Sequence, residues 1–483
     1  MKIFLPNNLK LEQLISENQP NFNFNYDKAL YFLHLLTALR VSRRNLNEKD
    51  GYVAISSQLL QKYGVRDFKN YREYFLKAGV IECTSYSESK ARKFRFKEKY
   101  WTDLEVLKAP DNRFWCKVVK IRTDFIKSKV QKGATNLDIL QYFNGSLTMC
   151  YSEAIDFIKE EFEKGKLLNA ETAYHKYLQR KISVQYIKDS HFFSSWDDYG
   201  RLHTNLTNLS TDLRQFLRWN GEPLSNIDFV NSQPMLSSLL FEPKFWQSDS
   251  MINYKNLKSI RFQDYRSWHP SISQTQYHMP NAQNLSANPQ PVWQTSHSEK
   301  RVKDLFTSSY SLSSYSSYHL SNTLILTKEA IPLYSEDIQS FVSTTREGKF
   351  YEYFAERLGL TEVDRKIIKA TIFTAFFGFP TEGRKRLSVE KKLFVKAFPN
   401  VVRLFDIIKR KGPSKLAHMM QSIESKLVFE HLVPHLQEEF TDMPIFTIHD
   451  SFLVPQSMAE EVKEAVSIKF NEVLGFTPML KVE

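Results

Sequence analysis

The stretch from Pro444 to Pro455 constrains the fold more than any other part of this chain. It reads Pro-Ile-Phe-Thr-Ile-His-Asp-Ser-Phe-Leu-Val-Pro, so apolar residues lie on both sides of a single His449-Asp450 pair. This pattern is typical of two short buried strands that meet at a tight turn. A carboxylate there is costly to bury alone, because it loses its solvating water. We expect a metal ion, a positive partner or an active-site cleft to meet Asp450, and a purely structural turn is the alternative.

The composition describes a folded protein with a surplus of positive charge. The chain has 483 residues, 42% hydrophobic and 14% aromatic, which is enough for two or three domains. Its net charge of +12 suits a polyanionic partner or an acidic membrane surface, and a merely soluble basic protein is the alternative. Cys83, Cys116 and Cys150 lack zinc-site or disulfide spacing, which indicates a cytoplasmic setting or an organelle matrix. We find no signal-peptide pattern or spanning apolar run, and expect no membrane partner.

Residues 51–100 predict a small module with two helices and a basic hairpin. Ser56 and Asp67 can cap two short helices, and the alternation of charge and aromatic residues from Lys93 onward predicts a half-exposed strand. The pattern resembles a winged helix. The basic residues of its wing would be Lys90, Arg92, Lys93, Arg95 and Lys97. A helical packing domain with a solvated charged hairpin is the alternative. We interpret Asp103 and Glu105, which follow, as surface charges.

Two motifs in the middle of the chain carry a glycine-arginine pair and a second acid. Residues 110–195 have helical spacing and no catalytic signature. Gly200 and Arg201 then supply a backbone that can approach a phosphate and a planar fork that can bind one. Asp228 comes at the end of a short apolar strand, and Pro234 can open the helix after it.

The segment 245–328 differs from the rest of the chain in its amino-acid composition. Ser, Tyr, Gln, Asn and Pro dominate it, and no apolar period persists. Such a sequence buries too little apolar surface to offset its ordering entropy, so we predict an insertion that is largely a long loop. A surface whose aromatic residues stack on single-stranded bases is the alternative.

The helix predicted from Arg365 to Gly378 presents two cations and an aromatic ring on one face. Lys369 is four residues after Arg365, and Phe377 is eight residues after Lys369. A nucleoside triphosphate needs cations for its phosphates and a ring for its base, although a solvated helix face would carry the same charges. A further helix from residue 415 to 430 contains Gln421 and precedes the His-Asp stretch.

In order and spacing these motifs resemble those of the family A DNA polymerases and the single-subunit RNA polymerases of phage and mitochondrial type. The resemblance covers residues 196–244 and 330–483, and it implies an α+β right-hand polymerase with palm, fingers and thumb. The implied domains are an N-terminal region (1–109) with a possible winged helix (51–100), a helical thumb-like region (110–195), a first palm segment (196–244), the insertion (245–328), fingers (329–400) and a second palm segment (401–483).

The resemblance also implies a role for each motif residue. Asp228, Asp450 and the backbone carbonyl of Phe229 would bind two Mg²⁺ ions, for which Mn²⁺ can substitute, and Lys369 would act with the two acids in catalysis. The nucleotide-binding residues would be Arg365, Lys369, Phe377, Gly378 and Gln233. The residues that bind primer and template would be Gly200, Arg201, Gln421 and His449, with Arg92, Lys93 and Arg95 of the wing. The partners would be primer-template or promoter DNA and nucleoside triphosphates, bound by a monomer.

Some of these motifs favour deoxyribonucleotides as substrates, and others favour ribonucleotides. Gln233 stands where DNA polymerases of family A carry Glu and the RNA polymerases carry a small residue. The gap of eight from Lys369 to Phe377 matches the RNA polymerases, whereas family A DNA polymerases have a gap of four. Gln421 is a family A feature, and Phe377 has no hydroxyl to bind a ribose. We favour a DNA polymerase that replicates or repairs a mobile element, phage or plasmid. The alternatives are an RNA polymerase or primase, an untemplated polymerase in defence, and a non-catalytic winged-helix DNA-binding protein.

Overall fold

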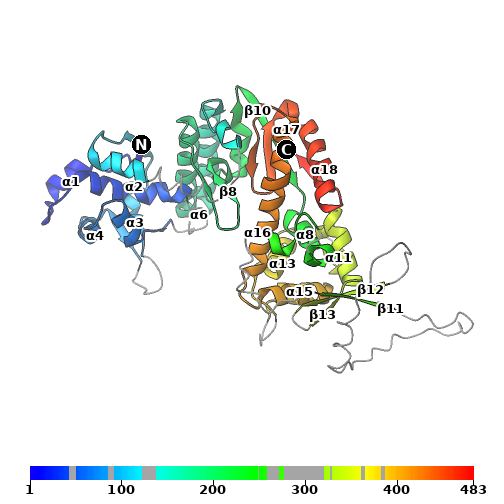
Figure 1. The fold of residues 1–483 in the computed structure, drawn as a ribbon. Helices are drawn as coiled ribbons and strands as arrows, with labels where there is room; N and C mark the ends of the chain where they lie inside the picture. Colours follow the sequence, from blue (N-terminus) through cyan, green and yellow to red (C-terminus); the bar gives the residue numbers. More distant parts are fainter. Residues whose placement is uncertain are drawn as a thin grey trace, which may run out of the picture. The chain divides into compact units, whose positions relative to one another are not determined.

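The computed structural model describes residues 1–42, 51–84, 92–121, 138–247, 250–257, 271–276, 320–326, 329–359, 365–381 and 387–483. Within these ranges the chain forms two compact units, each built from segments far apart in the sequence (Figure 1). Unit 1 comprises Met1–Asp228, Leu436–Lys463 and Val482–Glu483, and unit 2 comprises Phe229–His435 and Glu464–Lys481. Both units mix helices and strands, which agrees with the predicted α+β class. The division into palm, fingers and thumb stays a prediction.

The first part of unit 1 is a helical module closed by a pair of strands. Strand β1 (Lys2–Pro6) pairs antiparallel with β5 (Leu104–Lys108), so the two ends of the module meet. The elements between them are α1 (Leu11–Glu17), α2 (Tyr26–Ser42), β2 (Val53–Ala54), α3 (Ser57–Lys62), α4 (Phe68–Lys77), β3 (Ile81–Cys83), β4 (Lys93–Phe96) and the 3-10 turn η2 (Glu98–Tyr100). The strands β2, β4 and β3 form a small antiparallel sheet in that order.

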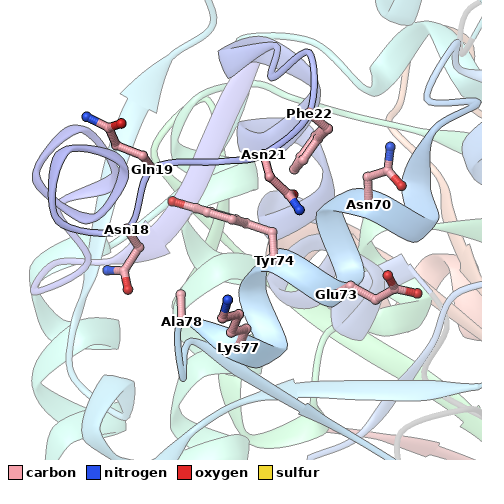
Figure 2. Close-up of a pocket in the computed structure, with 9 residues that line it drawn as sticks. All are labelled: Asn18, Gln19, Asn21, Phe22, Asn70, Glu73, Tyr74, Lys77 and Ala78. Atoms are coloured by element: carbon pink, nitrogen blue, oxygen red, sulfur yellow. The ribbon is translucent and has the colours of Figure 1, made fainter.

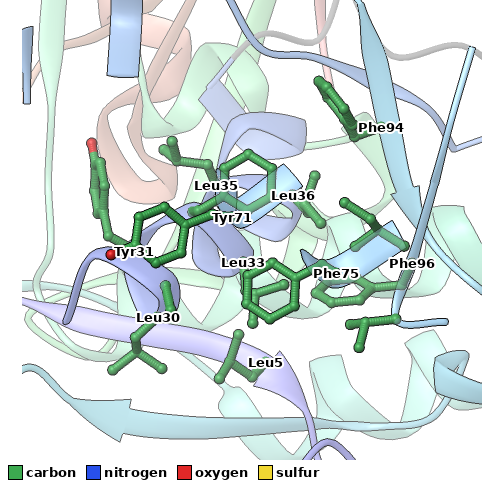
Figure 3. Close-up of a cluster of buried hydrophobic side chains, with 14 of the residues drawn as sticks. Leu5, Leu30, Tyr31, Leu33, Leu35, Leu36, Tyr71, Phe75, Phe94 and Phe96 are labelled. Carbon is green, nitrogen blue, oxygen red and sulfur yellow. The ribbon is translucent and has the colours of Figure 1, made fainter. Parts of the chain in front are cut away.

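The two helices predicted in this module are confirmed as α3 and α4. The Ser56 side chain accepts a hydrogen bond from the backbone amide of Leu59 at 3.2 Å, which caps the start of α3. Gly64, at a φ of +88°, allows the turn toward α4. Phe32 of α2 and Phe75 of α4 stack at 6.1 Å in the core of the module. Figure 3 shows Phe75 in this core together with Phe94 and Phe96 of β4. Its identity as a winged helix stays a prediction.

The rest of unit 1 is a sheet covered by helices. Its elements are η3 (Asp138–Tyr142), β6 (Leu147–Met149), α6 (Tyr151–Lys188), β7 (Ser194–Trp196), β8 (Leu202–Thr204), α7 (Asn205–Asn208), η4 (Thr211–Phe216), β9 (Leu217–Trp219), β10 (Glu222–Phe229), β14 (Phe446–Ile448), β15 (Ser451–Pro455) and η9 (Gln456–Met458). The sheet order is β14-β15-β10-β9-β6, and β16 (Leu480–Val482) also pairs with β10. Leu224 of β10 and Leu453 of β15 share a core with Leu178 and Ile182 of α6, so one face of this sheet is buried under α6.

Unit 2 is mainly helical. Its elements are α8 (Ser232–Ser237), η5 (Ser238–Phe241), α9 (Pro243–Gln247), η6 (Tyr254–Asn256), β11 (Ser271–Gln276), β12 (Leu320–Leu326), β13 (Glu329–Pro332), α11 (Glu336–Arg346), α12 (Phe350–Arg357), α13 (Arg365–Phe377), α14 (Val389–Ala397), α15 (Pro399–Lys409), α16 (Lys415–Lys426) and the π-helix η8 (Leu427–Leu432). Helices α17 (Val433–Glu439) and α18 (Ala459–Leu474) contribute residues to both units. Phenylalanine rings fill the core, with Phe341 and Phe350 at 5.1 Å and Phe376 and Phe405 at 4.9 Å. Among the described residues no helix is both long enough and apolar enough to cross a membrane.

The predicted long loop at 245–328 lies mostly outside the described residues. The prediction is wrong for two stretches of it that are described. Strands β11 and β12 pair antiparallel with Ser271 opposite Ile325, and β12 continues the sheet to β13. The sequence of β11 is almost entirely polar, so apolar periodicity could not reveal a strand that is defined by its backbone hydrogen bonds. The alternative of base stacking by its aromatic residues stays a prediction.

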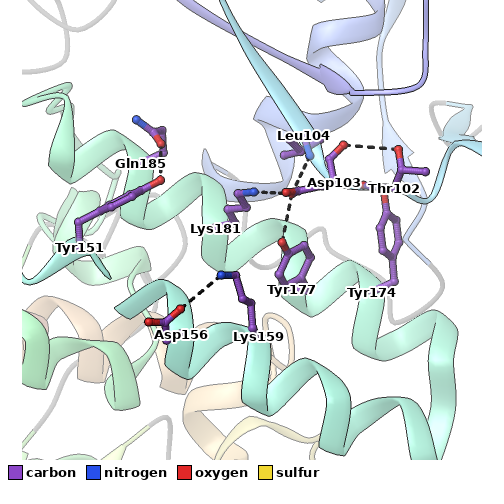
Figure 4. A network of polar contacts seen from close by, with 10 residues as sticks. All are labelled: Thr102, Asp103, Leu104, Tyr151, Asp156, Lys159, Tyr174, Tyr177, Lys181 and Gln185. Atoms are coloured by element: carbon purple, nitrogen blue, oxygen red, sulfur yellow. Dashed lines mark hydrogen bonds and ion pairs between the residues drawn. The ribbon is translucent and has the colours of Figure 1, made fainter. Parts of the chain in front are cut away.

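Asp103 lies at the surface, as expected, but it is not simply a solvated charge. Its carboxylate accepts hydrogen bonds from the Tyr177 hydroxyl at 3.1 Å, the Lys181 amine and the Leu104 amide (Figure 4). Burial alone would raise the pKa of Asp103, but these hydrogen bonds and the charge of Lys181 outweigh it, and the pKa lies below its ordinary value. Asp103 therefore ties the N-terminal module to α6. Lys181 is 78 residues away, which is why the sequence did not show the contact.

Candidate active site

The hairpin predicted around His449 and Asp450 is confirmed. Strands β14 and β15 pair antiparallel with Ile448 opposite Ser451, so His449 and Asp450 are the whole of the turn. His449 has a φ of +56°, a left-handed conformation that is uncommon for a residue with a side chain. Such a conformation costs on the order of 1 kcal/mol, and a two-residue hairpin turn requires it at its first residue.

Strand β10 brings the second acid to the same end of the sheet. Asp228 lies opposite Ser451 in the antiparallel register, which sets their Cα atoms about 5 Å apart, and Asp450 is the next residue. Both acids are partly exposed. Phe229, the last residue of β10, is buried, and its ring contacts Phe470 at 5.6 Å.

This donor set fits magnesium. Asp228 and Asp450 offer carboxylate oxygens, which are the ligands a hard cation prefers, and Mg²⁺ completes its shell with water and substrate phosphates. Within the described part of the chain, no group of three or more His, Cys, Asp and Glu residues could hold a metal ion by itself. A magnesium site at this hairpin would therefore depend on the substrate for part of its coordination.

Basic side chains surround His449. Burial is the largest of the causes that lower the pKa of His449 to about 4; the positive charges of Arg201, His203 and Arg214 act in the same direction, and Asp197 opposes them. The His203 and His449 rings meet edge to face at 5.7 Å. His449 is therefore neutral near pH 7. Its Nδ1 atom is inaccessible to solvent and has no hydrogen-bond partner among the described residues.

Asp197 shapes the loop that carries the expected phosphate-binding pair. Its carboxylate accepts hydrogen bonds from the backbone amides of Tyr199 at 2.9 Å and Arg201 at 3.0 Å, and it bonds His203 Nε2 at 3.0 Å. Burial alone would raise the pKa of Asp197, but these hydrogen bonds outweigh it and the pKa lies below its ordinary value. Gly200 has a φ of +86°, which glycine adopts without strain. The loop thus holds the backbone of Arg201 in one conformation.

Sequence reasoning assigned no role to Asp197, His203 or Arg214. A signal for His203 was present, because it comes two residues after Arg201 and alternate residues of an extended segment share a face. Arg214 lies on η4, ten or more residues further along, and only the fold brings its charge to His449.

In unit 2, helix α13 carries a row of one cation and two aromatic rings at steps of four residues. Lys369 is exposed, and its Nζ lies 5.7 Å from the ring centroid of Phe373. Phe373 is 45% exposed and contacts Phe377 at 5.1 Å. A Cβ atom at Gly378 would lie 2.4 Å from the carbonyl oxygen four residues earlier, so this position requires glycine. Arg365 is the first residue of α13, and its side chain lies outside what the structure describes.

Two buried lysines anchor the end of α13. The Lys409 amine donates to the carbonyl oxygen of Ala375, and the Lys391 amine donates to that of Phe379. The two residues are 1% and 5% exposed. Burial is the largest of the causes that lower the pKa of Lys409 to about 7; the charge of Lys391 acts in the same direction, and Asp406 opposes it. A carbonyl group in the last turn of α13 and one just beyond its end thus accept hydrogen bonds from lysine amines that sequence reasoning did not identify.

Gln233 is held by a buried acid. It lies on α8, and its amide nitrogen donates to the Glu424 carboxylate of α16 at 2.7 Å. Glu424 is 2% exposed, and the Oε1 atom of Gln233 is inaccessible to solvent with no hydrogen-bond partner among the described residues. The pair is separated by 191 residues, so the sequence did not predict it. Gln421 lies on the same helix as Glu424 and is partly exposed.

Arg95, the central residue of the expected basic wing, makes its contacts within the protein. The Arg95 guanidinium forms ion pairs with Glu82 of β3 at 2.5 Å and with Glu171 of α6, and it lies 4.5 Å from the ring centroid of Tyr52. Its side chain is only 16% exposed. Arg95 therefore packs the small sheet against its surroundings, which differs from the expected contact with DNA.

The other residues of the wing are placed as follows. Arg92 and Lys93 are partly exposed at the start of β4, and Lys97 is exposed just after it. Lys90 lies outside the described residues. Binding of DNA by Arg92 and Lys93 stays a prediction.

Comparisons with known proteins add little to this geometry. No family model matches the chain, and a search of curated proteins found no match. Among solved structures, the chain is similar to the POL domain of Pol1 from M. smegmatis in complex with DNA primer-template and dNTP. The two are 10% identical over 76% of this chain and 73% of that chain, with a TM-score of 0.32. At this TM-score the similarity does not establish a shared fold, so the functional assignment depends on the residues described above.

Proposed function

We propose that this protein is a nucleotidyltransferase of polymerase type, which extends the 3′ end of a DNA primer with deoxynucleotides. One observation carries the proposal: the register of β10 on β15 sets Asp228 beside the two-residue turn that holds Asp450. A pair of partly exposed carboxylates at one end of a sheet is the protein contribution that a two-magnesium reaction needs.

In unit 1 the acids and their basic neighbours would serve the primer. Two magnesium ions at such carboxylates lower the pKa of a primer hydroxyl and stabilise the charge of in-line displacement. Asp228 and Asp450 would hold the ions, with the Phe229 carbonyl as a further ligand. Arg201 would bind the terminal phosphate of the primer, and the unpartnered Nδ1 of neutral His449 would accept or donate one hydrogen bond there.

In unit 2 helix α13 would bind the nucleotide. Lys369, exposed on this helix, would neutralise the phosphates together with Arg365, and a ring at Phe373 or Phe377 would stack on the base or sugar. Gly378 would let the chain turn closely after that ring. Lys391 and Lys409 act through the end of the helix, and we regard them as positioning residues.

The position of Phe373 bears on the choice between DNA and RNA synthesis. It is four residues after Lys369, the gap of the family A DNA polymerases, and it is the more exposed of the two rings. It is followed by Thr374, whereas Phe377, at the gap of the RNA polymerases, is followed by Gly378, so our choice of sugar rests on Gln233. Gln233 is bulky and held by Glu424, which supports exclusion of a ribose. We propose a role in the replication or repair of a mobile element, phage or plasmid.

The proposal is tested by extending a labelled primer on a template with dNTPs or NTPs in parallel reactions. We expect magnesium-dependent extension with dNTPs, and none without template or without primer. Preference for NTPs or unprimed initiation would support the RNA polymerase or primase alternative. Extension without template would indicate an untemplated polymerase. If no nucleotide is incorporated, the proposal is contradicted, and the non-catalytic DNA-binding protein is the alternative that remains.

A further inference from the structure

A pocket in the N-terminal module takes no part in the proposed reaction. Its volume is about 580 Å³, a size common for sites that bind small molecules or single nucleotides. Residues 18–22, between α1 and α2, form one side (Figure 2). Asn70, Glu73, Tyr74 and Lys77 form the other side, and their spacing puts them on one face of α4.

Carboxamide groups dominate the polar lining of this pocket. Gln19, Asn21 and Asn70 are exposed, and their side chains make no hydrogen bond to any residue that the structure describes. Asn18 uses its amide nitrogen on the Leu14 carbonyl at 3.2 Å, which leaves its amide oxygen available. A carboxamide offers a donor and an acceptor side by side, and the edges of nucleobases present the complementary arrangement.

Aromatic rings provide an apolar surface in the same pocket. The rings of Phe22 and Tyr74 line it, and their centroids are 6.2 Å apart. Behind them Tyr71 contacts the Phe22 ring at 5.1 Å, and Phe24 contacts the Tyr74 ring at 5.4 Å and the Phe22 ring at 5.7 Å, so the surface has a packed support. An aromatic surface of this kind can stack on the flat face of any base.

The pocket lining also contains one positive and one negative side chain. Lys77 is the single cation in the described lining, and its exposed amine can pair with a phosphate. Glu73 is the single carboxylate, and it can accept a hydrogen bond from an amino group of a base. Amide, ring and cation together match the parts of one nucleotide.

We propose that this pocket binds one unpaired base of a single-stranded nucleic acid, with the adjoining phosphate at Lys77. The bases of a duplex stay stacked, and this pocket has residues of the segment 18–22 on one side and α4 on the other. A base outside the stack can enter a pocket, whereas a stacked base cannot. This proposal is independent of the nucleotidyltransferase activity, because none of its residues serves that reaction.

The test measures the affinity of the full-length protein for a fluorescent single-stranded oligonucleotide of about eight nucleotides, by anisotropy. The variants are Asn21→Ala combined with Asn70→Ala, and Lys77→Ala. Matched controls are Gln61→Ala on α3 and Lys69→Ala on α4, both exposed and outside the pocket. We expect each pocket variant to weaken binding about five- to tenfold, because the double variant removes contacts to the base edge and Lys77→Ala removes the cation that pairs with the phosphate. The controls should stay within about twofold, since a single surface contact contributes little.

An oligonucleotide that lacks its bases separates this proposal from general binding to phosphates. On that probe the double variant should bind as the wild type does, whereas Lys77→Ala should still weaken binding. The proposal would be overturned if the double variant lost as much affinity for the probe without bases as for the probe with bases. It would also be overturned if the pocket variants lost as much affinity for a duplex, or if their affinity for the single strand did not change. Full competition by a free mononucleotide would show a nucleotide site instead of a strand site, which also contradicts it.

Discussion

The acids of unit 1 and the cation of unit 2 are held by different kinds of structure. Asp228 and Asp450 lie at the end of paired strands, where the register fixes each backbone position to the residue. Lys369 projects from a single helix with only Phe373 beside it in the described contacts. The position of that helix depends on Lys391 and Lys409 at its far end. A substitution of either acid should therefore lower the rate of the chemical step directly. Nucleotide use by α13 should also be affected by substitutions that are far from the nucleotide.

The largest effect in unit 2 should come from Lys369→Ala. We expect the kcat/KM for the incoming nucleotide to fall about a hundredfold, because a charged contact to the phosphates is lost in the transition state. The binding of primer-template, measured without nucleotide, should not change. Lys392→Ala, which removes an exposed cation from α14, is the matched control. Equal effects of the two variants would show that Lys369 supplies only general charge.

A pH-dependent effect on stability should come from Lys409→Met. The pKa of Lys409 is about 7 in the folded protein and 10.5 when unperturbed, so the unfolded state binds more protons between these values. Stability should therefore rise with pH above about 7, by up to about 1.4 kcal/mol per pH unit, and below that pH the contribution of this group should not change with pH.

Denaturant unfolding at several pH values from 6 to 9 tests this prediction, and the difference between the wild type and Lys409→Met isolates the group. The free energy of unfolding of the wild type minus that of Lys409→Met should be constant below about pH 7 and should rise with pH above it. A constant difference over the whole range would mean that Lys409 keeps its ordinary pKa and that the end of α13 is anchored in another way.

The smallest effect should separate the two rings of α13. We expect Phe373→Ala to weaken use of dNTPs about fivefold and Phe377→Ala to do so less, since Phe373 is more exposed and lies next to Lys369. Phe379→Ala, at a ring 55% exposed beyond the end of the helix, is the control. A dominant effect of Phe377→Ala, together with preference for NTPs, would favour the RNA polymerase alternative.

Local patterns in the sequence predicted the parts of the site that neighbouring residues determine. Apolar runs on both sides of His449 and Asp450 predicted the hairpin, and the helical period predicted that Lys369 and Phe377 share a face of α13. The cap at Ser56 predicted the start of α3. In each case the signal lies within about ten residues, which is the range over which periodicity and capping act.

Long-range contacts account for what the sequence could not predict. Arg95 was expected to face DNA, but its partner Glu171 lies 76 residues away and holds it within the protein. Gln233 meets Glu424 across 191 residues, and Lys409 meets Ala375 across 34. A charged residue has the same local pattern whether it is solvated or buried against a distant partner, so only the tertiary structure distinguishes the two cases.

The most direct test of the central claim is primer extension by Asp228→Asn and Asp450→Asn in the presence of Mg²⁺. Each substitution keeps the size of the side chain and removes the charge that a metal ion needs. We predict that both variants lose about a thousandfold or more in the rate of extension, while their thermal unfolding and primer-template binding match the wild type. Asp442→Asn, at an exposed turn with a φ of +63°, should retain full activity. Extension at the wild-type rate by either Asp228→Asn or Asp450→Asn would contradict the assignment of the two acids.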